Sequence, residues 1–207
     1  MRRPHGKCWV LAIAAYLAWL GSPPARGAEI ELSLLAGAQQ TGGLTTRHGE
    51  LDLAAGGLFA GSVGWRVRPD GVVEIAWSHQ TANATGHDSG EPVHFDVDLD
   101  AVEFGGIWET RPGRFRPFIG MSLGATRLAG PGADFGEGWW FSGAFFGGLR
   151  YGLGEHALLR LEARGSGILI GDGGALACSS LPGQCSLGLT GSLLGAWSAR
   201  VGIAARF

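Results

Sequence analysis

The sequence predicts an all-β fold, an eight-stranded antiparallel up-and-down transmembrane β-barrel, and three observations lead to this prediction. First, the composition is rich in glycine and tryptophan, with 38 Gly and 8 Trp, while only 16% of the residues are charged. So much glycine disfavours helices. Second, residues 29–207 divide into segments in which every second residue is apolar, the pattern of β-strands. Third, the connections between these segments alternate between short and long, as in membrane barrels.

Residues 1–27 have the organisation of an export signal. Arg2, Arg3 and Lys7 form a basic start, residues 8–20 are apolar, and small residues lead up to Gly27. The apolar run is shorter than the roughly 20 residues that a membrane-spanning helix needs, which argues against an uncleaved anchor. We expect cleavage after Gly27, with cleavage after Ala28 as the alternative. Residues 28–207 would then form the barrel domain.

Removing the signal changes the charge balance of the chain. The full sequence has 16 Lys and Arg against 18 Asp and Glu, a net charge of −2. Four of the cations, Arg2, Arg3, Lys7 and Arg26, lie in the first 28 residues, so 12 Arg remain against 18 acidic residues and the net charge becomes −6. A nucleic-acid partner requires clustered cations. We therefore expect no nucleic-acid binding.

Two of the three cysteines, Cys178 and Cys185, lie in the stretch CSSLPGQC, with a Pro-Gly turn between them. An exported protein reaches an oxidising compartment, which favours a disulfide between such a pair. Closing so short a loop would stabilise the fold by about 2.5 kcal/mol. A zinc site is the weaker alternative, because two cysteines without a nearby histidine supply only half of the ligands.

The predicted strands follow one another along the whole mature chain. They cover residues 29–39, 55–68, 72–82, 93–110, 115–129, 139–153, 157–171 and 191–207. Tight glycine-containing turns are expected at 69–71, 111–114 and 154–156. Longer polar loops are expected at 40–54, 83–92, 130–138 and 172–190. Short turns would therefore gather at one end of the barrel and long loops at the other.

The two faces of each predicted strand differ in a way that suits lipid on the outside. In the segment from Leu159 to Ser166, Leu159, Leu161, Ala163 and Gly165 alternate with Arg160, Glu162, Arg164 and Ser166. A soluble barrel would bury the large apolar residues and expose the charges. Here we expect the apolar set to face lipid and the small and ionic set to face a closed interior, since an open edge in hydrocarbon leaves backbone groups unpaired.

An interior of eight strands is narrow enough for side chains to fill, so no wide channel is expected. Unpaired buried charges are costly, which predicts an ion-pair core. Its expected members are Glu74, Glu103, Glu162, Arg150, Arg160, Arg164 and Arg200. The strand at 93–110 breaks the pattern, because Phe95, Val97 and Leu99 share a parity with Glu103. We expect either a bulge near Asp100 or Ala101, or an outer half that stands beyond the lipid.

The chain resembles the small Gram-negative outer-membrane β-barrels of the OmpA/OmpX-like, porin-like kind. The resemblance rests on RPFIGMSLGATRL, FFGGLRYGLGEHALLRLEARG and the final ARVGIAARF. It implies a monomer in the outer membrane, surrounded by outer-membrane lipid. It also implies that the terminal residues Phe207, Ala205, Ile203 and Val201 form a signal for the barrel assembly machinery. The implied role is structural, with the long extracellular loops as an interaction surface.

Two chemical roles compete with this structural one. Divalent-metal capture is suggested by His48, His79, His87 and His94, together with Asp88, Asp96, Asp98 and Asp100. Their spacing matches no regular ligand pattern, so a hydrated acidic surface is favoured and no metal or cofactor is predicted. A rim enzyme acting on lipid A or phospholipid is the second alternative. It would need a catalytic set such as Ser and His, yet Ser78 and His79 are adjacent in a strand and point to opposite faces.

Overall fold

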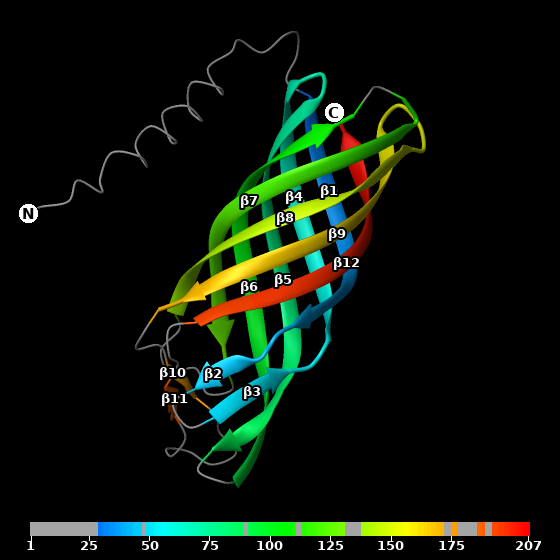
Figure 1. Cartoon of the computed structure of the whole chain (residues 1–207). Helices are drawn as coiled ribbons and strands as arrows, with labels where there is room; N and C mark the ends of the chain where they lie inside the picture. The colour runs from blue at the N-terminus through cyan, green and yellow to red at the C-terminus, as the bar shows by residue number, and fades with distance from the viewer. Residues whose placement is uncertain are drawn as a thin grey trace, which may run out of the picture.

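The computed structural model describes residues 29–46, 49–88, 91–110, 113–130, 138–171, 175–177, 186–188 and 192–207. Within these residues the chain forms a closed, eight-stranded antiparallel barrel (Figure 1). Its strands are β1 Ile30–Thr41, β4 Gly56–Arg68, β5 Gly71–Asp88, β6 Glu91–Glu109, β7 Phe115–Ala129, β8 Gly138–Gly152, β9 Ala157–Ile170 and β12 Ser192–Arg206. The described part of the chain contains no helix that is long and apolar enough to cross a membrane.

Each strand pairs with its sequence neighbours, and the first strand of the barrel closes on the last. β1 pairs with both β4 and β12, and β5 pairs with both β4 and β6. The closure is completed at Phe207, whose backbone N–H donates to the Ile30 carbonyl at 2.9 Å, while the Ile30 N–H donates to the Phe207 carbonyl at 3.1 Å. The predicted all-β barrel and its up-and-down order are confirmed.

The two ends of the barrel differ, as the alternation of connections predicts. The C-terminus lies at the end with the turns at 69–70 and 153–156, which we call the short-turn end (Figure 1). The opposite, long-loop end holds the small strands β2 Leu44–Thr46, β3 Gly49–Leu53, β10 Ala175–Ala177 and β11 Ser186–Gly188. β2 and β3 pair with each other, and β3 joins the barrel sheet beside β5.

The strand pair β5–β6 extends past the rest of the wall at the long-loop end. Its register runs without interruption from Gly71 opposite Trp108 to Asp88 opposite Glu91. β4 follows β5 only as far as Gln80, and β7 joins β6 only at Asp98. The expected loop at 83–92 is therefore mostly strand. Of the two alternatives for this strand, the bulge near Asp100 or Ala101 is wrong, because neither neighbour of β6 shifts register there.

Burial alternates along the barrel strands, and the large apolar side chains lie outside. Phe145, Trp197 and Leu34 are 72%, 74% and 70% exposed on the outer wall, whereas Arg150 is 0% and Arg160 2% exposed inside. The barrel is thus inverted relative to a soluble one.

The narrow interior also explains several inward-facing glycines. At Gly124 and Gly148 an added Cβ would collide with the carbonyl oxygens of Val102 and Leu161 on the neighbouring strands. At these positions only glycine lets the backbones approach so closely.

Candidate functional site

The interior at the short-turn end is filled by a group of ion pairs, here called the short-turn cluster. Its members are Glu31, Glu109, Arg66, Arg116, Arg150 and Arg206. Glu109 is its centre. Its carboxylate lies 2.5 Å from a guanidinium nitrogen of Arg150 and 3.3 Å from one of Arg66. Nitrogens of Arg116 and Arg206 each lie 3.7 Å from it. Glu31 holds Arg150 at 2.9 Å and Arg206 at 3.2 Å.

A second group of charges, the central cluster, fills the middle of the barrel. It consists of Glu74, Glu103, Glu162, Arg160, Arg164 and Arg200. Arg160 reaches Glu74 with both Nη atoms, at 2.9 and 3.2 Å, and Glu162 at 2.5 Å. Arg164 pairs with Glu103 and also donates to the Ser122 hydroxyl at 2.6 Å. The carboxylate of Glu162 is shared, because Arg164 and Arg200 approach it at 3.5 and 3.8 Å.

Two phenylalanine rings lie against the guanidinium groups of these clusters. The Phe118 ring has Arg150 and Arg160 at 5.3 and 5.4 Å from its centroid, and Phe146 lies 4.6 Å from Arg164. At these distances the ring faces attract the guanidinium groups. An isolated buried ion costs several kcal/mol in desolvation, so the dense pairing is what allows the interior to hold charge.

All seven residues expected in the ion-pair core face the interior. Glu74, Glu103, Glu162, Arg160, Arg164 and Arg200 meet in the central cluster, while Arg150 belongs to the short-turn cluster. Sequence reasoning missed the other members of the short-turn cluster, Glu31, Glu109, Arg66, Arg116 and Arg206. Parity along the strands carried a signal for two of them, since Glu109 lies six residues after Glu103 and Arg206 six after Arg200.

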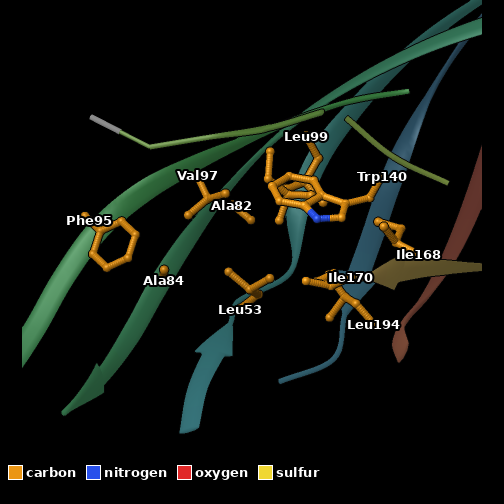
Figure 2. Close-up of a cluster of buried hydrophobic side chains, with 11 residues drawn as sticks. Leu53, Ala82, Ala84, Phe95, Val97, Leu99, Trp140, Ile168, Ile170 and Leu194 are labelled. Carbon is orange, nitrogen blue, oxygen red and sulfur yellow. The ribbon is translucent and has the colours of Figure 1, made fainter. Parts of the chain in front are cut away.

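The interior at the long-loop end is apolar, which differs from the expectation of a small and ionic bore throughout. We call this group the apolar plug. It consists of Leu53, Ala82, Ala84, Phe95, Val97, Leu99, Leu128, Trp140, Ile168, Ile170 and Leu194. Figure 2 shows side chains from β5 and β6 on one side, those from β9 and β12 on the other, and Trp140 between them. Phe95, Val97 and Leu99 therefore share a parity with Glu103 because all four face the interior, which is apolar at the long-loop end and ionic in the middle.

A row of polar side chains crosses the outer wall near the long-loop end. Register places His79 opposite Asp100, and Asp100 opposite Arg127. The His79 Nδ1 lies 2.9 Å from the Asp100 carboxylate, and an Arg127 nitrogen lies 3.9 Å from it. The Trp77 ring stacks on His79 at 6.2 Å between centroids. We call His79, Asp100 and Arg127 the outer row.

The residues considered for metal binding or catalysis are distributed as follows. Ser78 faces the interior and His79 the outside, so they form no pair with each other. His94 and Asp96 are exposed on the outer face of β6, and Asp98 accepts a hydrogen bond from the Thr81 hydroxyl at 2.7 Å. Among the described residues, no three histidine, cysteine or carboxylate side chains converge as a metal site. His48 and the side chains of His87 and Asp88 lie outside the described residues, as do the expected signal segment and the Cys178–Cys185 pair.

The residues of the expected assembly signal all lie along the outer face of β12 or directly after it. Val201, Ile203 and Phe207 are 48%, 61% and 73% exposed, and Ala205 shares their face. Arg206, between Ala205 and Phe207, points inward and binds Glu31. The last residues therefore combine an apolar outer face with an ionic contact across the closing seam.

No protein-family model matches this sequence, and no curated protein sequence is significantly similar to it. Solved structures do match. OprG, an outer membrane protein of Pseudomonas aeruginosa, has a TM-score of 0.59 at 11% identity, over 89% of this chain and 98% of its own. The outer membrane protein AlkL has a TM-score of 0.56 at 14% sequence identity, over 90% of this chain and 93% of its own. Neisserial surface protein A has a TM-score of 0.54 at 14% sequence identity, over 88% of this chain and 100% of its own. The chain therefore has the fold of the small outer-membrane β-barrels.

Proposed function

We propose that the chain is exported, loses residues 1–27, and spans the outer membrane of a Gram-negative cell as a monomeric barrel with a filled interior. The observation that carries this proposal is the inverted surface. Large apolar side chains such as Phe145 and Trp197 cover the outer wall, while the arginines and glutamates of the two clusters are inside. Exposing these apolar side chains to water would be unfavourable, whereas lipid hydrocarbon favours their exposure. Hydrocarbon also requires every backbone polar group to be paired, and the closed barrel meets this requirement.

The proposed role of the barrel is to hold an interaction surface outside the cell. The β5–β6 extension carries exposed polar side chains on its outer face, among them Asn83, Thr85, His94 and Asp96. Its inner face contributes Ala84, Phe95 and Val97 to the apolar plug, which gives the extension a rigid base. Surface segments fixed to a rigid scaffold are where binding residues commonly lie.

The same proposal assigns the outer face of β12 a role in assembly. Val201, Ile203, Ala205 and Phe207 would be read by the barrel assembly machinery before the seam with β1 closes. The exposure of Phe207 and its two backbone hydrogen bonds to Ile30 support this role. Replacing Phe207 by Ser should lower the amount of folded protein in the membrane without changing its melting temperature after refolding.

Cell fractionation with heat-modifiable gel mobility tests the location and the fold together. The folded barrel should appear in the outer-membrane fraction and migrate differently before and after boiling. N-terminal sequencing of that band should start at residue 28. A processed chain that stays monodisperse in buffer without detergent would contradict the proposal.

A rim enzyme acting on outer-membrane lipid is the second candidate, and the outer row supports it. The contact between His79 Nδ1 and Asp100 leaves Nε2 as the group that would activate water, in the manner of a general base oriented by a carboxylate. The test is release of fatty acid from outer-membrane lipid by the purified protein. Activity that disappears in His79→Ala would favour the enzyme, and absence of lipid release would exclude it for the substrates tested.

A further inference from the structure

A small cavity lies inside the barrel between the central cluster and the apolar plug. Its volume is about 30 Å³, and Leu99 and Ile168 of the apolar plug line one part of it. Leu58 and Ala101 are also apolar, and the other lining residues are polar, among them Arg164, Arg200, Ser78, Gln80, Thr126 and Ser166. A space of this size suits one or two water molecules or a single small ion, and it excludes larger anions such as phosphate.

Arg200 is the least compensated cation that faces this cavity. It is 8% exposed, its Nε donates to the Ser198 hydroxyl at 3.1 Å, and its nearest carboxylate in the described part of the chain is Glu162 at 3.8 Å. Glu162 is already shared with Arg160 and Arg164. Those two arginines each have a second carboxylate, in Glu74 and Glu103 respectively, and Arg200 gains none from the described residues. A buried guanidinium in this position favours a further anionic partner.

The remaining lining can also donate hydrogen bonds into the cavity. Hydroxyl groups come from Ser78, Thr126 and Ser166, and each can turn its hydrogen toward the cavity. The one carboxylate in the lining, Glu103, is engaged by Arg164 and by the Ser122 hydroxyl at 3.1 Å. The apolar residues on the other side lower the local dielectric, which strengthens the attraction between an anion and the two arginines.

We propose that this cavity is an internal binding site for a small monovalent anion of chloride size. Arg164 and Arg200 supply the positive charge, and the hydroxyls of Ser78, Thr126 and Ser166 complete the shell. The anion would act as a further partner of Arg200 and link it to Arg164. The proposal goes beyond the surface role, and it would hold whether or not the loops bind a partner.

Diffraction with bromide is the direct test, because bromide resembles chloride in size and scatters anomalously. Crystals of the purified full barrel in detergent, soaked in sodium bromide, should give an anomalous peak in the cavity beside Arg164 and Arg200. Bromide peaks confined to the protein surface, or density in the cavity that is fully explained by water, would overturn the proposal.

Thermal unfolding in solution gives an independent readout. Total ionic strength is held constant while sodium chloride replaces sodium gluconate, whose anion is too large for the cavity. The midpoint should rise with the chloride concentration, as expected for a ligand that binds only the folded state. A midpoint that does not respond to chloride, at any concentration tested, would contradict the site.

Two variants and a control locate the effect. Arg200→Gln should raise the chloride concentration needed for half of the effect by about tenfold or more, since a charge-assisted contact is lost. Ser166→Val keeps both arginines but fills the cavity, so it should also remove the response to chloride. This variant tests the site even if Arg200→Gln does not fold. Thr81→Val, which removes an exposed outer hydroxyl, should respond as the parent does. An unchanged response in Ser166→Val would place the anion elsewhere and overturn the proposal.

Discussion

Glu109 illustrates how a single residue can hold one end of this barrel together. Its carboxylate lies near guanidinium groups from four strands, β4, β7, β8 and β12, while Glu109 itself ends β6. The pairs with β4, β8 and β12 therefore connect β6 to strands that are not its neighbours in the sheet. Backbone hydrogen bonds hold adjacent strands, and these side-chain contacts tie the wall across the interior.

Removing one member of a buried pair should be costly. Glu74→Gln leaves Arg160 with only part of its compensation, because Glu74 accepts from both of its Nη atoms. We expect a loss of about 3–5 kcal/mol in the free energy of unfolding, measured by urea titration of the barrel in lipid vesicles. Glu155→Gln, on an exposed turn, is the control and should change little. Equal losses in the two variants would mean that the central cluster contributes no specific stability.

A second prediction about single residues concerns the glycines that face the interior. In Gly124→Ala the new methyl group would meet the carbonyl of Val102, and the backbone must shift to admit it. We expect a loss of about 1–3 kcal/mol, as for overpacking in a tight core. Gly57→Ala is the matched control, because nothing lies within 4 Å of its added Cβ. Urea unfolding of both variants tests the difference, and a milder effect at Gly124 than at Gly57 would contradict it.

At the scale of elements, the period-2 pattern predicted all eight barrel strands because each one alternates between two chemically different surroundings. The pattern was less informative beyond residue 82, where Asn83 and other polar residues suggested a loop. Asn83 and Thr85 face outward on β5, whereas Ala84, Phe95 and Val97 belong to the apolar plug. The polar residues in this segment indicate that the outer face of the strand is in contact with water. They do not indicate a loop. The plug itself joins six barrel strands and β3, and only the three-dimensional register brings these residues together.

The apolar plug can be tested with two adjacent tryptophans of β8. Trp140 is 9% exposed within the plug, whereas Trp139 is 57% exposed on the outer wall. Trp140→Ala should therefore cost about 3–5 kcal/mol, since a large buried side chain leaves a cavity, and Trp139→Ala should cost clearly less. Urea titration monitored by gel mobility measures both. A larger loss from Trp139→Ala would mean that the plug is not a packed core.

For the whole molecule, one arrangement of polarity accounts for its shape and its interior. The ionic clusters occupy the short-turn end and the middle, and the apolar plug occupies the long-loop end. With eight strands there is no room for a wide channel beside them. The outer wall also changes along its length. Apolar residues such as Trp77 and Val102 are followed, toward the long-loop end, by the outer row and then by the exposed β5–β6 extension. This change marks where the proposed bilayer ends and water begins.

That boundary predicts how the barrel responds to a new charge at two exposed positions. Leu34 is 70% exposed midway along β1, and Asn83 is exposed on the β5–β6 extension. If the wall is in lipid, Leu34→Arg places a cation in hydrocarbon and should cost about 2–4 kcal/mol, whereas Asn83→Arg lies in water and should cost almost nothing. Unfolding by guanidinium chloride in vesicles compares the two free energies. Because both side chains are exposed, a barrel surrounded by water would tolerate both changes equally, and that result would refute the proposed membrane position.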